Sequence, residues 1–480
     1  MKLSKWPLLL CLLFVIVCAV PAGAAEQVAP GIRQWSFERT NWDGKPVKGY
    51  VLEVNPLQKN TEIRVVPGHE VLGSKETLSS MAERTGAVAA VNGGFFDTVS
   101  GLPVGNLFID GQAEYISDIL RTSLAFAYDG SVKMGYLNPK LFVEVAGQGR
   151  LAVQGINLRA PGDGLVLYSR AYGQAAPGDA RVFLAPAGGG LFLVQPAGGS
   201  LPPAGGYVLS GCGAAASQVM SLPAGAKVKV VTELPAGWGN LRHALSAGPL
   251  LVEDGLPVEQ ALQEGLWGQL LKPAPRTALG VTAQGKVLLV VVDGRQESSA
   301  GLTLEELSYL MLDLGARRAV ALDGGGSSEI WVKGKILNSP SDKKERPLAN
   351  GLLVIRQMPV YVDRQRLYLD VAPVIEQGRT LVPMRKIFER LGVAVAWDEA
   401  GKTVTAVKGD CTVKLTVGQT AALVNNKKVK LDVPAKVING RTMVPMRFVS
   451  EALGARVNYQ AAPVQAVYIE SPEGGGGDGQ

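Results

Sequence analysis

The most informative stretch of this chain for the fold is GLTLEELSYLMLDLGARRAVALDGGGSSE, residues 301–329. Residues 302–315 place leucines at helical spacing, and Thr303 with Glu306 three residues later has the spacing of a capping box. The apolar run AVAL follows and ends at Asp323, where three glycines begin. A helix, a strand and a Gly-rich turn in this order predict a site at the carboxyl end of the strand.

The same plan occurs earlier in the chain. TLSSMAERTG, residues 77–86, predicts a helix that Thr77 caps, and the strand AVAAV then runs to Asn92 at the start of NGGFFD. We therefore expect residues 92–97 to converge with residues 323–329. From this alternation we predict an α+β or mixed α/β fold, in which the catalytic domain has a mixed sheet core and few helices.

After Ile355 the sequence changes in style and an internal repeat appears. GRTLVPMRKIFERLGVAVAWD, from Gly378, is echoed by GRTMVPMRFVSEALGARVNYQ, from Gly440. Each copy predicts a strand, a short helix that ends at Gly392 or Gly454, and a second strand. We predict a small C-terminal α+β domain made of two repeats.

The amino terminus has the layout of a cleavable secretory signal. Lys2 and Lys5 precede the apolar run 8–20, and small residues follow at 22–24. An uncleaved anchor is the competing interpretation, but the run is short for a membrane span of about 20 residues. We predict a secreted protein, extracellular or cell-wall associated, with no membrane span after cleavage. The predicted domains are a signal peptide at 1–24, a catalytic domain at 25–357, the repeat domain at 358–470 and a flexible tail at 471–480.

The composition is that of a globular protein. The 480 residues are 47% hydrophobic and 19% charged, enough for two or three independent cores. The net charge of +6 is not gathered into a basic block, which argues against nucleic-acid binding. Cys212 and Cys411, the pair left after the leader, form no recognisable disulfide or metal pattern. Nothing in the sequence indicates the oligomeric state.

The segment DGGGSSE is the first candidate for chemistry. Its glycines Gly324, Gly325 and Gly326 allow backbone N–H groups to turn towards one small anion, and Ser327 and Ser328 would add hydroxyl donors. A tight Gly-rich turn is the structural alternative. The sequence has no nucleotide-binding P-loop, Ser-His-Asp arrangement or zinc pattern, so we predict no cofactor and no protein metal ligand. A carboxylate-bound divalent cation stays an open alternative.

Carboxylates and arginines accompany this segment. Asp293 follows the apolar run VLLVVV as Asp323 follows AVAL, and such a carboxylate either caps a turn or faces a site. With Asp97, Glu329 and several arginines, the two aspartates indicate acid/base capacity and phosphate recognition.

Eight motifs follow one another in the order NGGFFD, HALSAGPLLVEDG, PRTALGV, VVDGRQ, GLTLEEL, LDGGGSSEIWVKGK, NSPS and ERPLANG. Together they resemble the phosphodiester glycosidase family, that of the uncovering enzyme, over residues 50–355. The resemblance implies a hydrolase that acts on phosphodiester-linked sugars such as N-acetylglucosamine. It also implies a site formed by Asn92, Gly93, Gly94, Phe95, Phe96, Asp97, Arg276, Asp293, Arg295, Asp323, Gly324, Gly325, Gly326, Ser327, Ser328, Arg346 and Asn350.

This resemblance suggests chemical roles, which we state as a hypothesis. Asp323 and Asp293 are the expected acid/base or nucleophile, and Asp97 is the third candidate. We expect phosphate or product to be bound by Arg276, Arg295 and Arg346. Phe95 and Phe96 are expected to form an apolar or stacking wall, and core packing is the alternative role for these two residues.

The VPMR motifs at residues 382–385 and 444–447 resemble the copper amine oxidase N-terminal domain, an accessory unit of secreted bacterial proteins. No histidine lies between Met358 and Gln480, so we do not expect copper there. The methionines Met384, Met443 and Met446 are predicted core residues.

The expected function is cleavage of the glycosidic bond of a sugar-1-phosphodiester in a cell-wall phosphoglycan or exopolysaccharide, which releases sugar and a phosphomonoester. Two other classes stay open. One is a non-catalytic glycan-binding protein of the cell wall that uses the same cleft. The other is a glycosyl-phosphate transferase in envelope polymer assembly.

Overall fold

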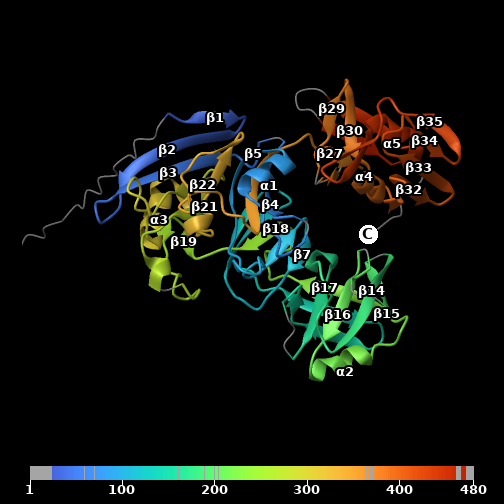
Figure 1. The fold of residues 1–480 in the computed structure, drawn as a ribbon, viewed down its shortest axis with the longest axis horizontal. Helices are drawn as coiled ribbons and strands as arrows, with labels where there is room; N and C mark the ends of the chain where they lie inside the picture. Colours follow the sequence, from blue (N-terminus) through green and yellow to red (C-terminus); the bar gives the residue numbers. More distant parts are fainter. Residues whose placement is uncertain are drawn as a thin grey trace, which may run out of the picture.

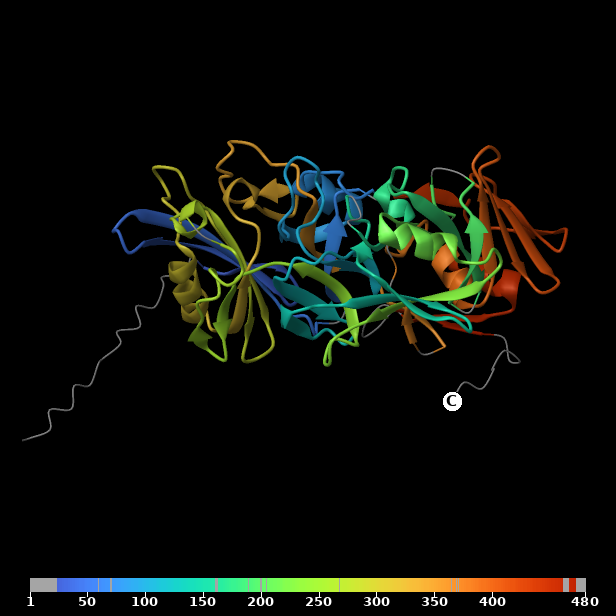
Figure 2. The same cartoon turned by 90° about the horizontal axis from the view of Figure 1, so that it is seen from below.

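The computed structural model describes residues 24–471 except 59, 70, 160–162, 189, 199–200, 204, 267, 364, 368, 370 and 461–465. The predicted signal peptide, apart from Ala24, and all but the first residue of the predicted tail lie outside the described residues. Strands gathered into several sheets dominate the secondary structure, and the C-terminal part forms one end of the molecule (Figures 1 and 2).

An eight-stranded antiparallel sheet carries the strand that leads to Asp323. Helix α3 (Leu304–Asp313) covers one face of this sheet, where Leu307 and Leu310 pack in one core with Val290. The strand order is β1 (Glu26–Ala29), β2 (Ile32–Thr40), β3 (Pro46–Val54), β22 (Val287–Val292), β21 (Arg276–Thr282), β23 (Ala316–Ala321), β19 (Leu250–Glu253) and β20 (Leu256–Pro257).

Two five-stranded antiparallel sheets meet the other face of the first sheet in a shared core, in which Leu289, Val91 and Leu124 are fully buried. Helix α1 (Leu78–Thr85) packs on the first of the two. One order is β25 (Lys335–Ile336), β24 (Ile330–Val332), β5 (Ala87–Asn92), β26 (Asn350–Arg356) and β4 (Thr61–Pro67). The other is β7 (Gln112–Tyr115), β6 (Leu107–Ile109), β18 (Leu241–Ser246), β8 (Thr122–Ala127) and β9 (Val132–Tyr136).

A further eight-stranded sheet is inserted between β9 and β18, and its core also includes Phe108 of β6 and Ala244 of β18. Helix α2 (Ala214–Met220) packs on it. The order is β11 (Gly149–Val153), β10 (Lys140–Val145), β17 (Lys227–Glu233), β15 (Leu191–Pro196), β14 (Ala180–Gly188), β16 (Tyr207–Gly211), β13 (Leu165–Tyr168) and β12 (Gly155–Ile156).

The C-terminal repeats form three small sheets around a separate core. As predicted, each repeat contains a strand, a helix, α4 (Met384–Arg390) or α5 (Met446–Leu453), and a second strand. Met384 and Met443 are buried and Met446 packs partly buried against the core. The first sheet has the order β28 (Gln365–Leu367), β27 (Val360–Val362), β39 (Ala466–Glu470) and β38 (Arg456–Gln460). The second has the order β29 (Val374–Glu376), β30 (Arg379–Pro383), β37 (Arg441–Pro445) and β36 (Lys436–Ile438). The third has the order β31 (Ala394–Asp398), β32 (Thr403–Lys408), β33 (Cys411–Thr416), β34 (Ala421–Val424) and β35 (Lys427–Lys430).

The predicted α+β or mixed α/β fold class is wrong, because the protein is mostly β with antiparallel sheets. Among the described residues, only β12 with β13 and β27 with β39 pair in parallel. The alternation of helix, strand and Gly-rich turn was misleading, because the strands that follow α1 and α3, β5 and β23, pair only with antiparallel neighbours. The unbroken apolar run VLLVVV in β22 is likewise typical of a parallel strand covered on both faces. Strand β22 is antiparallel and still covered on both faces, with Leu289 in the shared core and Val290 beneath α3.

The two helices predicted from the sequence are confirmed. Thr77 caps α1 by accepting a hydrogen bond from the backbone N–H of Ser80, and Gly86 ends that helix in the left-handed conformation with φ 68°. Thr303 and Glu306 form the expected capping box of α3. None of the helices in the described ranges is long and apolar enough to span a membrane. Cys212 and Cys411 are free thiols.

Candidate functional site

The ends of β5 and β23 meet through the side chain of Asn92, which is fully buried. Its Nδ2 donates to the carbonyl oxygen of Asp323 at 2.7 Å, and its Oδ1 accepts from the hydroxyl of Thr277 at 2.7 Å and from the N–H of Glu329 at 3.2 Å. The N–H of Asp323 also donates to the carbonyl oxygen of Gly93 at 3.1 Å. The structure therefore brings NGGFFD and DGGGSSE together, although they belong to two different sheets.

Asn350, the first residue of β26, holds the turn that follows Asn92. Its Oδ1 accepts from the N–H of Gly94 at 2.8 Å, and its backbone oxygen accepts from the N–H of Gly93 at 3.1 Å. A β-carbon on Gly93 would lie 2.0 Å from this Oδ1, so no larger residue fits there. Asn92, Gly93, Gly94 and Asn350 thus form the support of the site.

A pocket of about 160 Å³ opens beside Asp323. It extends from the Gly-rich turn to Pro249, which follows a cis peptide bond. Its polar lining combines one carboxylate with several guanidinium groups: Asp323, Arg276, Arg295 and Arg346.

Asp323 has the electrostatics of an acid/base group. Burial raises the pKa of its carboxyl to about 6, against the lowering effects of a hydrogen bond with Ser327 and the charges of Arg346 and Arg121. The N–H of Gly324 donates to Asp323 Oδ1 at 2.9 Å. A carboxyl with a pKa near 6 is mainly ionised at pH 7 and exchanges protons readily near neutral pH.

Two arginines on one side of the pocket differ in how they are held. Arg276 is buried, and its Nε and Nη2 donate to the carbonyl oxygens of Leu302 at 2.8 Å and Lys272 at 2.7 Å. Burial and the charge of Arg295 lower the pKa of Arg276 to about 10. Arg295 is exposed, has a φ of 60° and, within the described part of the chain, has no carboxylate at ion-pair distance. Its charge is available to an anionic ligand.

Arg346 is fixed over the Gly-rich turn. Its Nη2 lies 2.7 Å from Asp342 Oδ2 and its Nη1 donates to the hydroxyl of Ser327 at 3.4 Å. A β-carbon on Gly326 would lie 1.9 Å from Arg346 Nη2, so glycine is required for this arrangement. The turn therefore serves to bring an arginine close to the backbone.

The N–H groups of the Gly-rich turn are used mainly within the protein. Gly324 donates to Asp323, Gly325 to the carbonyl oxygen of Pro275 at 2.9 Å, and Ser328 to that of Gly325 at 3.2 Å. The expected nest for one small anion is therefore not formed by these groups, and the positive charge at the site comes from arginine side chains.

Arg121 is a site residue that the sequence reasoning missed. Its guanidinium carbon lies 4.8 Å from the ring centre of Phe95, and its Nε and Nη1 are buried without a hydrogen-bond partner. The charges of Asp323 and Glu264 both act on it. In the sequence it is a single arginine before the apolar strand β8, and no local pattern distinguishes it.

Glu329 is a second buried carboxyl close to the turn, outside the expected site. Burial raises its pKa to about 8, so the group is protonated at neutral pH. Its Oε1 accepts from the N–H of Arg346 at 2.7 Å, while its Oε2 has no hydrogen-bond partner.

Asp293, Asp97 and Phe96 do not line the pocket. Asp293 is buried and its Oδ1 accepts from Asn338 Nδ2 at 3.1 Å and from the N–H of Ser339 at 3.0 Å, and burial raises its pKa. Asp97 accepts from the N–H of Ser100 at 2.6 Å within its own exposed turn, and these hydrogen bonds lower its pKa. Phe96 packs in the core under α1, whereas Phe95 lines the pocket.

Metal ligands are not clustered at this site. Within the described ranges, no group of three or more His, Cys, Asp or Glu side chains is arranged to hold an ion. The chemistry available from the chain itself is therefore one ionisable carboxyl among guanidinium groups.

Comparisons with known proteins agree with the motifs. A model of the phosphodiester glycosidase family matches residues 179–355, and one of the copper amine oxidase N-terminal domain matches residues 361–468. An N-acetylglucosamine-1-phosphodiester alpha-N-acetylglucosaminidase of Bos taurus is 37% identical over 67 residues, 14% of this chain and 12% of that protein. The SPbeta prophage-derived protein YomE of Bacillus subtilis (strain 168) is 36% identical over 113 residues, 24% of this chain and 17% of that protein.

The chain thus spans only a small part of the length of these two relatives. A solved structure of a putative exported protein from Burkholderia pseudomallei K96243 has a TM-score of 0.54 and 28% identity, and the match covers 65% of this chain and 74% of that one. The chain combines a phosphodiester glycosidase domain, which supports a glycosidase-type function, with a copper amine oxidase N-terminal domain.

Proposed function

We propose that the protein is a secreted hydrolase that cleaves the glycosidic bond of a sugar-1-phosphodiester in a cell-envelope or exopolysaccharide glycan. The observation that carries the proposal is the pocket in which one carboxyl, Asp323, with a pKa near 6, faces Arg276, Arg295 and Arg346. Such a lining suits a ligand that places an anionic phosphate next to a neutral sugar.

The arginines favour departure of the phosphate. A phosphomonoester is a stable anion, so its release needs charge stabilisation more than protonation, and fixed cations in a partly desolvated pocket supply this. Arg295 and Arg346 are the cations closest to the Gly-rich turn, and Arg276 approaches Gly324 with its guanidinium held by backbone oxygens.

Asp323 then acts on the sugar side. In its ionised form it either takes a proton from the attacking water or attacks the anomeric carbon itself. By either route, water adds across the bond between the anomeric carbon and the phosphate oxygen, and the bonding electrons stay on that oxygen. The products are the free sugar and a phosphomonoester.

Two features support secretion and an envelope substrate. The leader-like sequence before Ala25 predicts export, and the similar Burkholderia protein is itself named a putative exported protein. A second domain of a type that accompanies secreted proteins fits a protein that works on a polymer outside the cell.

The experiment is hydrolysis in ¹⁸O-labelled water. Residues 25–480 are incubated with UDP-N-acetylglucosamine and simple sugar-1-phosphodiesters, with and without EDTA, and the products are analysed by mass spectrometry. The proposal predicts equal amounts of free sugar and phosphomonoester, with the label on the sugar. Label on the phosphate, or transfer of a glycosyl phosphate to an added alcohol, would show that the protein breaks a bond to phosphorus and would contradict glycosidic cleavage.

A further inference from the structure

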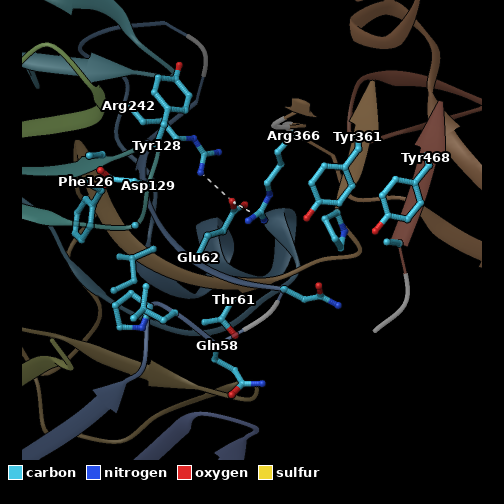
Figure 3. Close-up of a pocket in the computed structure, with 18 of the residues that line it drawn as sticks. Gln58, Thr61, Glu62, Phe126, Tyr128, Asp129, Arg242, Tyr361, Arg366 and Tyr468 are labelled. Carbon is cyan, nitrogen blue, oxygen red and sulfur yellow. Dashed lines mark hydrogen bonds and ion pairs between the residues drawn. The ribbon is translucent and has the colours of Figure 1, made fainter. Parts of the chain in front are cut away.

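A second pocket of about 360 Å³ lies between the catalytic domain and the C-terminal domain. Figure 3 shows Tyr361 and Tyr468 projecting from the C-terminal wall, with Tyr128 on the catalytic-domain wall and Thr61 at the base. This volume is sufficient for a ligand of one or two sugar rings.

The C-terminal wall presents a pair of stacked aromatic rings. Tyr361 and Tyr468 are directly paired on the parallel strands β27 and β39, and their rings stack with centres 5.0 Å apart and an angle of 10° between their planes. Tyr468 is 36% exposed, and Tyr128 on the other wall is 38% exposed. Exposed aromatic faces flanked by polar groups suit the C–H faces of a pyranose ring, which is apolar on its faces and polar around its edge.

The base of the pocket has polar atoms that lack partners. Thr61 is only 4% exposed, and its Oγ1 has no hydrogen-bond partner. The Oδ1 atom of Asn60 is also buried without a hydrogen-bond partner. Buried polar atoms are normally paired, so these two are positioned to bond a ligand. Because one is a hydroxyl and the other an acceptor, a sugar hydroxyl, which both donates and accepts, satisfies them.

The charges of the lining balance. Glu62 lies 2.8 Å from Arg242 and 3.7 Å from Arg366, which comes from the C-terminal domain, and Asp129 supplies the second negative charge. The pocket beside Asp323 has an excess of arginines, whereas this one does not. Its lining therefore favours an uncharged ligand.

We propose that this interdomain pocket binds a pyranose ring of a neutral glycan, stacked against an outer face of the Tyr361–Tyr468 pair and hydrogen-bonded to Thr61 and Asn60. The bound ring contacts both domains, so the C-terminal domain contributes directly to holding a glycan. The inference stands apart from hydrolysis at Asp323.

The test is saturation-transfer NMR on residues 25–480 with maltohexaose, cellohexaose and chitohexaose as probes. We expect at least one of them to bind, and about tenfold weaker binding in Tyr361→Ala/Tyr468→Ala. Thr61→Val, which keeps the side-chain shape and removes the hydroxyl, is expected to weaken binding as well. Tyr309→Ala, at an exposed tyrosine on α3, and Arg295→Ala, in the other pocket, are the matched controls and are expected to bind normally.

Three results would overturn the proposal. The first is that no hexasaccharide binds. The second is that the wild type and both pocket variants bind equally well, and the third is that only Arg295→Ala loses binding. Binding of glucose 6-phosphate but not of the neutral sugars, lost in the same pocket variants, would overturn the assignment of an uncharged ligand. Because Thr61→Val does not depend on the tyrosines, it decides the case if the double variant fails to fold.

Discussion

Asn92 Nδ2 donates a hydrogen bond of 2.7 Å to the carbonyl oxygen of Asp323, and so the end of one sheet fixes the end of another. The same amide accepts from Thr277 and Glu329, so all its hydrogen bonds are made within the protein. Asn92 therefore acts as a positioning residue: it sets where the Asp323 carboxyl lies without contacting a ligand.

Asn92→Ala is expected to lower both stability and activity. The change leaves the Thr277 hydroxyl and the Glu329 N–H without their acceptor in a buried place, which costs about 2–4 kcal/mol of unfolding free energy. Urea unfolding measures this cost. An unchanged unfolding free energy would mean that the junction of β5 and β23 is held by other contacts.

Gly326→Ala is expected to reduce kcat/KM by about a hundredfold, because a misplacement of about 1 Å in a site has effects of that size. The new β-carbon would occupy the space of Arg346 Nη2 and push the guanidinium away from Ser327. Gly239→Ala is the matched control, because Gly239, like Gly326, does not have a positive φ and a β-carbon there meets nothing within 4 Å. Full activity of Gly326→Ala would show that Arg346 is not needed where it lies.

Arg295→Ala is expected to lower kcat/KM on phosphodiesters by about 10- to 100-fold, the effect of removing one charge-assisted hydrogen bond. Arg295 is exposed, so the unfolding free energy is expected to stay within about 0.5 kcal/mol of the wild type. Arg295→Lys keeps the charge and is expected to recover part of the activity. Equal losses in the Ala and Lys variants would argue against a charge effect.

Glu329→Gln is expected to change the pH dependence of stability. The carboxyl has a pKa of about 8 in the folded protein and about 4.3 in the unfolded chain, so folding keeps a proton that the unfolded chain releases. The wild type therefore loses stability as pH rises from about 4.5 to 8, by an amount on the order of 5 kcal/mol.

The glutamine variant lacks this slope, and its advantage over the wild type is expected to grow across that window and level off above pH 8. Melting temperatures measured from pH 4 to 9 test this. Parallel curves for the two proteins would contradict a raised pKa.

The local structure of this protein could be predicted further than its fold. The capping signals at Thr77 and Thr303 correctly located two helices, and the glycines after Asn92 and Asp323 marked two strand ends that do meet. Strand direction could not be read in the same way, because the apolar run of β22 is the same whether its neighbours are parallel or antiparallel.

The site was harder to predict for a related reason. Asp293 and Asp323 follow similar apolar strands, and the sequence cannot show that one carboxylate accepts bonds from Asn338 and Ser339 while the other faces a pocket. Arg121 reaches the site only through packing on Phe95, a contact that depends on two distant segments. Such contacts leave no trace in spacing or composition.

The most direct test of a catalytic role for Asp323 is the turnover of Asp323→Asn on a sugar-1-phosphodiester at pH 7. We expect a loss of at least about 10³-fold in kcat, together with a melting temperature no lower than that of the wild type, since the amide removes a carboxylate whose ionisation burial disfavours. We also expect wild-type activity to rise with pH through about 6 as Asp323 ionises. Near-wild-type turnover in Asp323→Asn would show that Asp323 is not the catalytic carboxyl.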